Sequence, residues 1–345
     1  RMLVVLPNMS CKLRCPNCFT WNSGVMPSDQ RMELSLIESI VRQAAEMEVS
    51  CVELSGGGEP LEHPEAEKML QVLVEGRNKH KTFRAGLITN GLEITRMLNL
   101  GDWIVQLDYV RLGYTEYFDR PGHDSAKSLF WEALEILGQK KMQDERAKVR
   151  IGVKLLLTRD NATSLEERLE GILRLKARRT QRYVVDHVKI KSIRGDNEPT
   201  PDLIRAMEHK LTLLKSKLGE RANDLQIDIK SAKVPSTYSC WINPIMSVIG
   251  VSGDVYLCCN FYECPDDLKI GSLGIKGEDH FREFWGKARH RDVMDRVAPA
   301  SVCNSRWGCH CRLVHYQELV EPLVPYSDRD TPVIGTFFVG HEKML

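Results

Sequence analysis

Short apolar runs rich in β-branched residues alternate with amphipathic helical patterns along the first two-thirds of the chain. Each run is a predicted strand, and it is followed by apolar residues at the three- and four-residue spacing of a helix face. Parallel strands need crossover connections of this kind, whereas antiparallel strands can be joined by tight turns. The predicted strands cover residues 2–6, 51–54, 82–88, 103–112, 148–157 and 184–193. Helices are predicted over residues 34–48 and 63–74, and around 126–137, 165–173 and 204–218.

Six consecutive β–α repeats predict an α/β fold with a parallel sheet and helices outside it. Six units are fewer than the eight of a closed barrel, so we expect a partial (β/α)6 TIM-like barrel. Binding and chemistry in such sheets occur at the C-terminal ends of the strands. Several candidate segments fall at these ends, and we expect them to converge. They are the loop after the first strand, the glycine run 56–58, the turn 89–91 and the pair Arg194-Gly195.

Composition is that of an ordinary globular protein. The 345 residues are 42% hydrophobic and 28% charged, with a formal net charge of +1. Scattered charges and a near-neutral total argue against a nucleic-acid partner. No apolar run is long enough to span a membrane, and the opening apolar segment is too short for a signal peptide. We therefore expect a cytoplasmic protein; the sequence starts at Arg1, which leaves open whether a segment precedes it.

The pattern changes near residue 230, and we expect a second, smaller unit from there. Two short runs, 247–251 and 255–257, flank Ser252-Gly253-Asp254, which is typical of a β-hairpin. A helix carrying Phe281, Phe284, Trp285 and Ala288 is predicted next. The expected organisation is a barrel over 1–230, an extension of a β-hairpin plus a helix over 231–325, and a C-terminal tail over 326–345.

The cysteines are clumped, which indicates metal binding. Eleven are present, in an early group over 11–18 and a late group over 240–311, with only Cys51 outside them. A secreted disulfide scaffold would be shorter and would spread its cysteines along the chain. Disulfides are therefore the weaker alternative.

The early group places Cys11, Cys15 and Cys18 in one loop directly after the first predicted strand. Thiolates suit iron–sulfur clusters or zinc. A [4Fe–4S] cluster usually takes four cysteines, so three would leave one iron open to a ligand that is not protein. The alternative at this point is a zinc site completed by a distant residue such as His63.

This loop and the glycine run that ends the next predicted strand carry a family resemblance. The loop reads Cys11-Lys-Leu-Arg-Cys15-Pro-Asn-Cys18, and the run reads Gly56-Gly57-Gly58-Glu59-Pro60. They resemble the CxxxCxxC and GGEP motifs of the radical S-adenosylmethionine (SAM) superfamily. One departure is Asn17, where many members have an aromatic residue.

The resemblance implies a cofactor set and a type of chemistry. It implies that the three cysteines bind a catalytic [4Fe–4S] cluster and that the amino and carboxylate groups of SAM bind its open iron. It also implies reductive cleavage of SAM to a 5′-deoxyadenosyl radical, which abstracts hydrogen from the substrate. In such an enzyme the cofactor carries the difficult chemistry and the protein positions it.

Further residues are candidates for binding the cofactor. The bare backbone of Gly56, Gly57 and Gly58 can approach a ligand closely, and Glu59 and Pro60 complete that motif. The turn at Thr89 and Asn90 resembles one near the SAM ribose in the family, although a simple β-turn explains it equally well. Side chains alternate between the two faces of the fourth to sixth predicted strands, so one set would point into the barrel. Basic side chains of that set could bind the SAM carboxylate or an anionic substrate. The alternative is that these basic residues are solvent-facing charges at the barrel rim. The basic candidates are Arg111, Lys154, Lys189, Lys191 and Arg194.

The late cysteines resemble the SPASM and twitch extensions of radical SAM enzymes. Twelve residues separate Cys240 from Gly253, and four separate Gly253 from Cys258. The glycine is suited to turn the hairpin that brings the two thiolates together. The resemblance implies one auxiliary [4Fe–4S] cluster, because the later cysteines depart from the full SPASM order; zinc is the alternative. Two of Cys303, Cys309 and Cys311 would complete the site, and Cys259 and Cys264 are spare.

An auxiliary cluster bound entirely by protein suits electron acceptance. The resemblance to twitch-type dehydrogenases implies hydrogen abstraction from a carbinol carbon and oxidation to a ketone. Redox-neutral epimerisation and modification of a ribosomally made peptide are the alternatives. The first strand begins almost at residue 1, so we expect no leader-peptide-binding domain before it, which favours a small sugar- or aminoglycoside-like substrate. The expected partner is a one-electron reductant such as flavodoxin or ferredoxin, and the non-enzymatic alternative is a zinc-stabilised binding protein.

Overall fold

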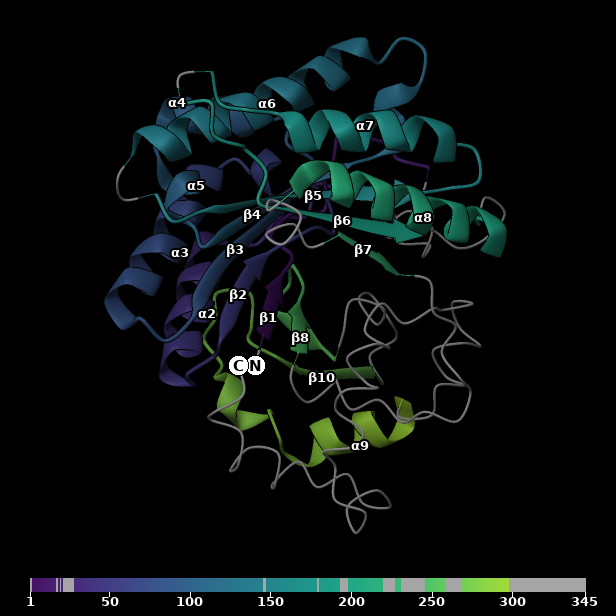
Figure 1. Cartoon of the computed structure of the whole chain (residues 1–345). Coiled ribbons are helices and arrows are strands. Elements are labelled where there is room, and N and C mark those ends of the chain that lie inside the picture. The colour runs from purple at the N-terminus through teal and green to yellow at the C-terminus, as the bar shows by residue number, and fades with distance from the viewer. Residues whose placement is uncertain are drawn as a thin grey trace.

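One mixed sheet forms the centre of the molecule, and helices cover its outer face (Figure 1). The computed structural model describes residues 2–16, 18, 20, 28–144, 147–178, 180–192, 198–219, 227–230, 246–257 and 268–297. The sheet has ten strands in the order β10-β9-β8-β1-β2-β3-β4-β5-β6-β7. The strands are β1 (Met2–Val5), β2 (Cys51–Leu54), β3 (Arg84–Thr89), β4 (Tyr109–Tyr114), β5 (Arg150–Leu157), β6 (His187–Ser192), β7 (Ile227–Lys230), β8 (Met246–Ile249), β9 (Asp254–Tyr256) and β10 (Lys269–Ser272).

Strands β1 to β7 are parallel and lie side by side in chain order. The sheet is not closed, because β10 and β7 are its two ends. The predicted α/β fold with a partial TIM-like barrel is confirmed. The structure adds a seventh parallel strand, β7, to the six that the sequence predicts, with Ile229 paired to Ile190 of β6.

The helices form where apolar residues recur at helical spacing. In α2, Leu36, Ile37, Ile40 and Ala44 all lie on the buried face. Helix α8 begins after Thr200, whose hydroxyl accepts a hydrogen bond from the Leu203 N–H at 3.2 Å. The helices are α2 (Leu34–Glu46), α3 (Ala66–His80), α4 (Ile94–Leu100), α5 (Trp103–Gln106), α6 (Asp124–Gln143), α7 (Ala162–Arg174), α8 (Pro201–Leu218) and α9 (Ala288–Val297).

The segment predicted as one strand over 103–112 is instead the short helix α5 followed by β4, which starts at Tyr109. Asp108 holds the turn between them. Its carboxylate accepts hydrogen bonds from the Ala85 backbone N–H at 2.7 Å and from the Arg77 guanidinium at 3.1 Å. Both partners are more than twenty residues away in the chain, so the local apolar pattern could not locate this boundary.

Three smaller differences follow from packing. Helix α4 was not predicted from the sequence. The predicted helix beginning at Phe281 is a 3-10 turn over Phe281–Glu283, and α9 begins only at Ala288. Leu129, expected on the buried face of α6, is 40% exposed, whereas its neighbour Phe130 is fully buried. Tertiary packing therefore selects the buried face of α6.

The C-terminal extension continues the same sheet. Strand β8 lies parallel to β1, with Leu3 paired to Ser247, and β9 then runs antiparallel to β8, which confirms the predicted hairpin. Gly253 has a φ of +84°, and a Cβ there would lie 2.4 Å from the carbonyl oxygen of Gly274, so the turn needs glycine. The domain boundary at residue 230 stays a prediction.

A buried polar network joins the extension to α2. The Ser39 hydroxyl donates to the Gly277 carbonyl at 2.7 Å and accepts hydrogen bonds from Arg42 and Gln43. The Gln43 amide donates to the Asp279 carbonyl at 2.9 Å, and its oxygen accepts from the Phe281 N–H at 2.7 Å. These contacts link segments more than 230 residues apart.

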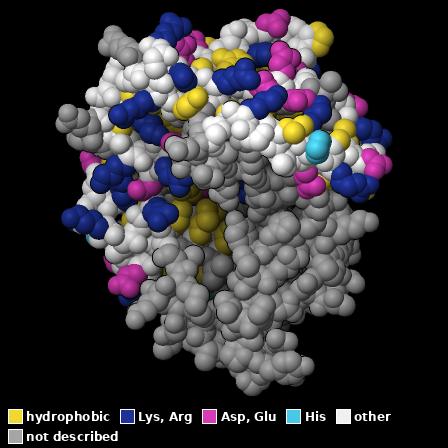
Figure 2. All heavy atoms as spheres, in the orientation of Figure 1, with side chains coloured by type: hydrophobic (Ala, Val, Ile, Leu, Met, Phe, Trp, Pro, Cys, Tyr) yellow, Lys and Arg dark blue, Asp and Glu magenta, His cyan; other side chains and the backbone are white. Residues whose placement is uncertain are grey.

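The charged surface agrees with the composition. On the face drawn in Figure 2, Lys and Arg side chains are mixed with Asp and Glu over the helices, so no single-sign patch dominates the coloured part of this face. Among the described residues, no helix combines the length and the apolar character needed to cross a membrane.

Candidate iron–sulfur site

The cysteine loop follows β1 and is bound to the end of β2 by backbone hydrogen bonds. The Gly58 N–H donates to the Asn8 carbonyl at 2.6 Å, and the Glu59 N–H donates to the Ser10 carbonyl at 2.8 Å. The Asn8 side-chain amide, fully buried, donates back to the Glu59 carbonyl at 2.9 Å. Sequence analysis missed Asn8; the only available signal was a polar residue directly before the cysteine loop.

The glycine run packs tightly against this loop. A Cβ on Gly58 would lie 2.0 Å from the Ser10 carbonyl oxygen, and one on Gly57 would lie 2.4 Å from the Met9 sulfur. The Gly57 carbonyl also accepts a hydrogen bond from the Thr20 hydroxyl at 2.7 Å. Glycine at 58 is therefore required for the loop to approach β2, whatever ligand binds there, whereas at 57 the Met9 side chain could shift and the nearest backbone atom, the Asn8 carbonyl oxygen, is 3.3 Å away.

The Glu59 carboxylate accepts hydrogen bonds from three donors within the described part of the chain. They are the Leu61 N–H at 3.1 Å, the Thr89 hydroxyl at 2.6 Å and the Asn90 N–H at 2.7 Å. Burial raises the pKa of this carboxyl to about 7, although the three hydrogen bonds act in the opposite direction. Glu59 thus joins the end of β2 to the end of β3, which gives it a positioning role beside the cofactor-binding role expected from its motif.

The turn after β3 places an amide beside the first cysteine. Asn90 Nδ2 donates to Cys11 Sγ at 3.9 Å, and Asn90 Oδ1 accepts from the Leu92 N–H at 2.9 Å. Gly91 has a φ of +87°, which completes the turn. The predicted turn therefore does touch the cysteine loop.

The three cysteines are partly buried free thiols. Cys15 Sγ is hydrogen-bonded to the Thr115 hydroxyl at 3.3 Å, and the Cys18 N–H donates to the Cys15 carbonyl at 3.1 Å. Burial, and then the negative charge of Glu59, raises the pKa of Cys11 to about 12. Burial likewise raises the pKa of Cys15 above its usual range. Thr115, at the end of β4, was also missed from the sequence.

The donor set fits an iron–sulfur cluster. Three soft thiols stand in one loop, two of them with a polar group at the sulfur, as is usual around cluster thiolates. Their buried thiolate forms are disfavoured without a cation, and the iron of a cluster would supply that charge. Within the described part of the chain, no three His, Cys, Asp or Glu side chains are already arranged around one metal position.

His63 does not fit the zinc alternative, because both of its ring nitrogens are engaged by backbone groups. Nδ1 accepts a hydrogen bond from the Glu65 N–H at 3.1 Å, which places the proton on Nε2. Nε2 lies 3.0 Å from the Met32 carbonyl, to which it donates. No lone pair of this buried ring is left for a metal ion.

The other predicted site residues divide into two sets. Arg111 and Lys154 lie on β4 and β5, and they are partly buried. Arg194 and the late cysteines fall outside the described residues, namely Cys240, Cys258, Cys259, Cys264, Cys303, Cys309 and Cys311.

Comparison with known proteins agrees with the site. Residues 2–112 match the protein family described as a 4Fe-4S single cluster domain, and this span contains the cysteine loop, the glycine run and the turn at 89–91. No curated protein matches the chain by sequence.

Solved structures resemble the chain at low identity, and those with a TM-score above 0.5 share its fold. The structure "Native anSMEcpe with bound AdoMet" matches with a TM-score of 0.53 and 16% identity, over 85% of this chain and 82% of that chain. The same protein with bound AdoMet and the Kp18Cys peptide matches with a TM-score of 0.53 and 15% identity, over the same shares. BtrN in complex with AdoMet and 2-DOIA matches with a TM-score of 0.40 and 13% identity, over 89% and 90% of the two chains.

Residues 2–112 therefore match an iron–sulfur family, and the chain shares the partial-barrel fold of the anSMEcpe structures. The family match also supports a [4Fe–4S] cluster as a cofactor.

Proposed function

We propose that the chain is a radical SAM oxidoreductase that abstracts hydrogen from a small polar substrate and oxidises it. The cysteine loop is the observation that supports this most. Its thiols lie on a segment that is hydrogen-bonded to Gly58 and Glu59, at the ends of strands where such barrels bind their ligands. The anSMEcpe structure that shares this fold has AdoMet bound, which supports SAM as the second cofactor.

Cys11, Cys15 and Cys18 would hold the cluster, and the glycine run 56–58, of which Gly56 is exposed, would bind SAM. When bound, the cluster and SAM supply one-electron cleavage of SAM and a 5′-deoxyadenosyl radical that abstracts hydrogen. The protein's part is positioning. The Asn8 amide links the cysteine loop to the Glu59 carbonyl. The Glu59 carboxylate in turn binds Thr89 and the Asn90 N–H, and the Asn90 side chain lies 3.9 Å from the Cys11 sulfur.

The proposal extends to the late cysteines. Cys240, Cys258 and two of Cys303, Cys309 and Cys311 would hold an auxiliary [4Fe–4S] cluster. Its chemistry would be acceptance of one electron from the substrate radical that remains after loss of a hydrogen atom and a proton, which yields the ketone. A flavodoxin or ferredoxin would reduce the first cluster, and the substrate would be a sugar-like molecule with a carbinol carbon.

The test is replacement of Cys11, Cys15 and Cys18 together by Ala, compared with Cys51→Ala. Cys51 is a free thiol on β2, where it contacts Tyr109 rather than the loop. Anaerobically purified wild type should be brown, contain about eight irons per chain for two clusters, and form 5′-deoxyadenosine with dithionite. The triple variant should lose about four irons and all 5′-deoxyadenosine, whereas Cys51→Ala should keep both. Undiminished SAM cleavage in the triple variant would refute the proposal.

Modification of a peptide is a second candidate, because the fold is shared with anSMEcpe in its complex with the Kp18Cys peptide. Reduced enzyme would be incubated separately with sugars and with cysteine-containing peptides, and 5′-deoxyadenosine formed above the basal rate would be measured. Stimulation by sugars alone supports the dehydrogenase proposal. Stimulation by peptides alone refutes it in favour of a peptide-modifying enzyme.

A further inference from the structure

Strands β4 to β6 carry basic side chains on their inner face, outside the cysteine loop. Along β4, Val110 and Leu112 are fully buried, whereas Tyr109 and Arg111 alternate with them and are partly exposed. Strands β5 and β6 repeat this alternation. Because helices cover the outer face of the sheet (Figure 1), the partly exposed residues face the inside of the barrel.

The register of the strands aligns these residues in two rows. In the first row, Arg111 of β4 pairs with Gly152 of β5, which pairs with His187 of β6. A Cβ on Gly152 would lie 2.1 Å from His187 Nε2, so the imidazole crosses this glycine toward Arg111. Adjacent positions in a row are about 5 Å apart.

The second row lies two residues nearer the cysteine loop along each strand. Gly113 pairs with Lys154, and Lys154 pairs with Lys189. Gly113 has no side chain, and a Cβ there would meet only the Thr89 carbonyl, at 3.8 Å, which leaves space beside Lys154. Beyond Lys189, the register position on β7 is that of Asp228.

Arg111 is held in place but is not fully hydrogen-bonded. Its guanidinium lies 5.9 Å from the centre of the Tyr109 ring, and the Tyr109 hydroxyl donates to the buried Glu53 carboxylate at 2.7 Å. That hydrogen bond fixes the ring beneath the guanidinium. The buried Arg111 Nε has no hydrogen-bond partner among the residues that the structure describes, and a buried donor of this kind is costly unless a ligand satisfies it.

The electrostatic effect of the cations is visible at His187. Burial, and then the positive charges of Arg111 and Arg150, lowers the pKa of His187 to about 4, and Lys189 acts in the same direction. Asp186 opposes this shift but does not reverse it. The imidazole is therefore neutral at pH 7, and it can donate or accept a hydrogen bond within a positive field.

We propose that Arg111, Lys154, His187 and Lys189 form a binding wall for an anionic group of the substrate, a phosphate or a carboxylate. This inference rests on the proposed function, because it assumes that the inside of the barrel receives a substrate. Two neighbouring lysines and a planar guanidinium suit phosphate or carboxylate oxygens. The same charges disfavour a polycationic aminoglycoside, so the wall narrows the substrate class to an acidic molecule such as a sugar acid or sugar phosphate.

The probe is inorganic pyrophosphate, titrated calorimetrically into the anaerobic holoprotein with saturating SAM. Lys189→Gln is compared with Lys140→Gln, which removes the same charge from the outer helix α6, where Lys140 pairs with Asp102. Wild type and Lys140→Gln should bind within twofold of each other, and Lys189→Gln should bind at least tenfold more weakly. Lys189→Arg keeps the positive charge and should restore most of the affinity for pyrophosphate. This result would show that the loss in Lys189→Gln comes from the missing charge and not from a folding defect.

Three outcomes would overturn this inference. They are absence of saturable binding to wild type, equal affinities of Lys189→Gln and Lys140→Gln, or displacement of SAM by pyrophosphate, which would show that the wall binds the SAM carboxylate. Iron content and 5′-deoxyadenosine formation are measured on the same wild-type preparation. Protein that cleaves SAM without binding pyrophosphate refutes the anionic wall alone, whereas protein without cluster or SAM cleavage refutes the proposed function.

Discussion

Among single residues, Glu59 shows how one buried carboxylate can join the ends of two strands at the candidate site. It is buried, and its oxygens receive the Leu61 N–H, the Thr89 hydroxyl and the Asn90 N–H. Its motif identified it as important from the sequence. Its hydrogen-bond partners could not be identified in that way, because Thr89 and Asn90 lie about thirty residues further along the chain.

Replacing Glu59 with Ala should therefore affect stability and cluster binding together. The change leaves three buried donors without an acceptor, and we expect the free energy of unfolding to fall by about 3 kcal/mol. Asn90 would no longer be held beside Cys11, so the iron content should also fall. Denaturant unfolding and an iron assay measure the two effects. Glu65→Gln, an exposed change nearby, is the control and should leave both unchanged; a stable, fully loaded Glu59→Ala protein would show that the carboxylate does not position the loop.

His63 and Asp108 make the same point at other positions. The sequence offered His63 as a zinc ligand, but the buried ring is occupied by the Met32 carbonyl and the Glu65 N–H. Asp108 was placed within a strand, but its carboxylate ends the segment before β4 by binding Ala85 and Arg77. In both cases a polar side chain found a partner that is distant in sequence.

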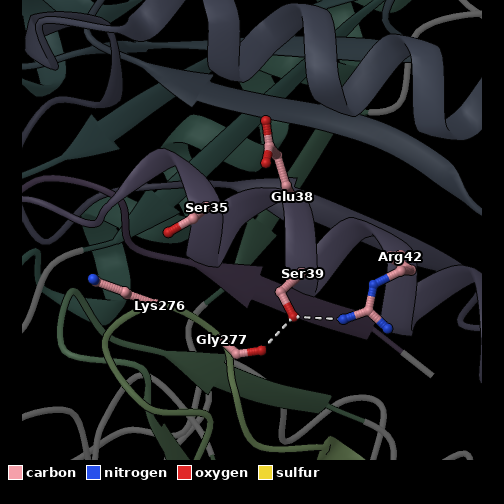
Figure 3. Close-up of a pocket in the computed structure, with 6 residues that line it drawn as sticks. All are labelled: Ser35, Glu38, Ser39, Arg42, Lys276 and Gly277. Carbon is pink, nitrogen blue, oxygen red and sulfur yellow. Dashed lines mark hydrogen bonds between the residues drawn. The ribbon is translucent and has the colours of Figure 1, made fainter.

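At the scale of elements, the junction between α2 and the extension explains how the C-terminal part is attached to the barrel. Figure 3 shows the outer end of this junction, a surface pocket of about 400 Å³ in which Ser39 lies between the Gly277 carbonyl and Arg42. Gln43, one turn further along α2, bonds to both Asp279 and Phe281. The pocket lies at this junction and not at the cysteine loop.

Replacing Gln43 with Ala should loosen this junction. The Phe281 N–H and the Asp279 carbonyl would lose their hydrogen-bond partners, and we expect the free energy of unfolding to fall by about 2 kcal/mol. Hydrogen exchange of the amides in 273–283 should quicken more than that of β3 or β4. Gln71→Ala, on the outer surface of α3, serves as the control. Uniform exchange across the molecule would mean that Gln43 stabilises the whole fold and not this junction.

At the scale of the whole molecule, histidines with lowered pKa values make stability depend on pH, and His290 and His187 are two of them. His290 in α9 is fully buried, and its Nδ1 accepts a hydrogen bond from the Gly286 N–H at 2.9 Å. Its Nε2 has no hydrogen-bond partner within the described ranges of the chain. Burial lowers the pKa of His290 to about 4, and His187 is lowered to a similar value. Both rings therefore stay neutral in the folded protein at pH values at which they bind protons in the unfolded chain.

The resulting prediction is a loss of stability as the pH falls from about 6.5 to about 4. Above pH 6.5 neither histidine lowers the free energy of unfolding, because its ring is neutral in both the folded and the unfolded state. At pH 5 the unfolded chain is protonated and the folded one is not, so His290 alone should lower the free energy of unfolding by about 2 kcal/mol. Denaturant unfolding at pH 7.5 and pH 5 should show a smaller difference for His290→Gln than for wild type. The exposed His80→Gln is the control, and an unchanged difference in His290→Gln would contradict the assignment.

The sequence by itself determined the α/β repeats, the parallel barrel, the hairpin around Gly253 and the cysteine and glycine motifs. These features are local, since periodicity, turn residues and motif spacing act within a few residues of one another. The tertiary structure alone decided that β8 pairs with β1 and that α2 fastens the extension through Ser39 and Gln43. It also decided that Glu59 and His63 are occupied by protein donors and acceptors. Those outcomes depend on which buried polar groups meet after the chain has folded, because each must find a hydrogen-bond partner wherever in the sequence it lies.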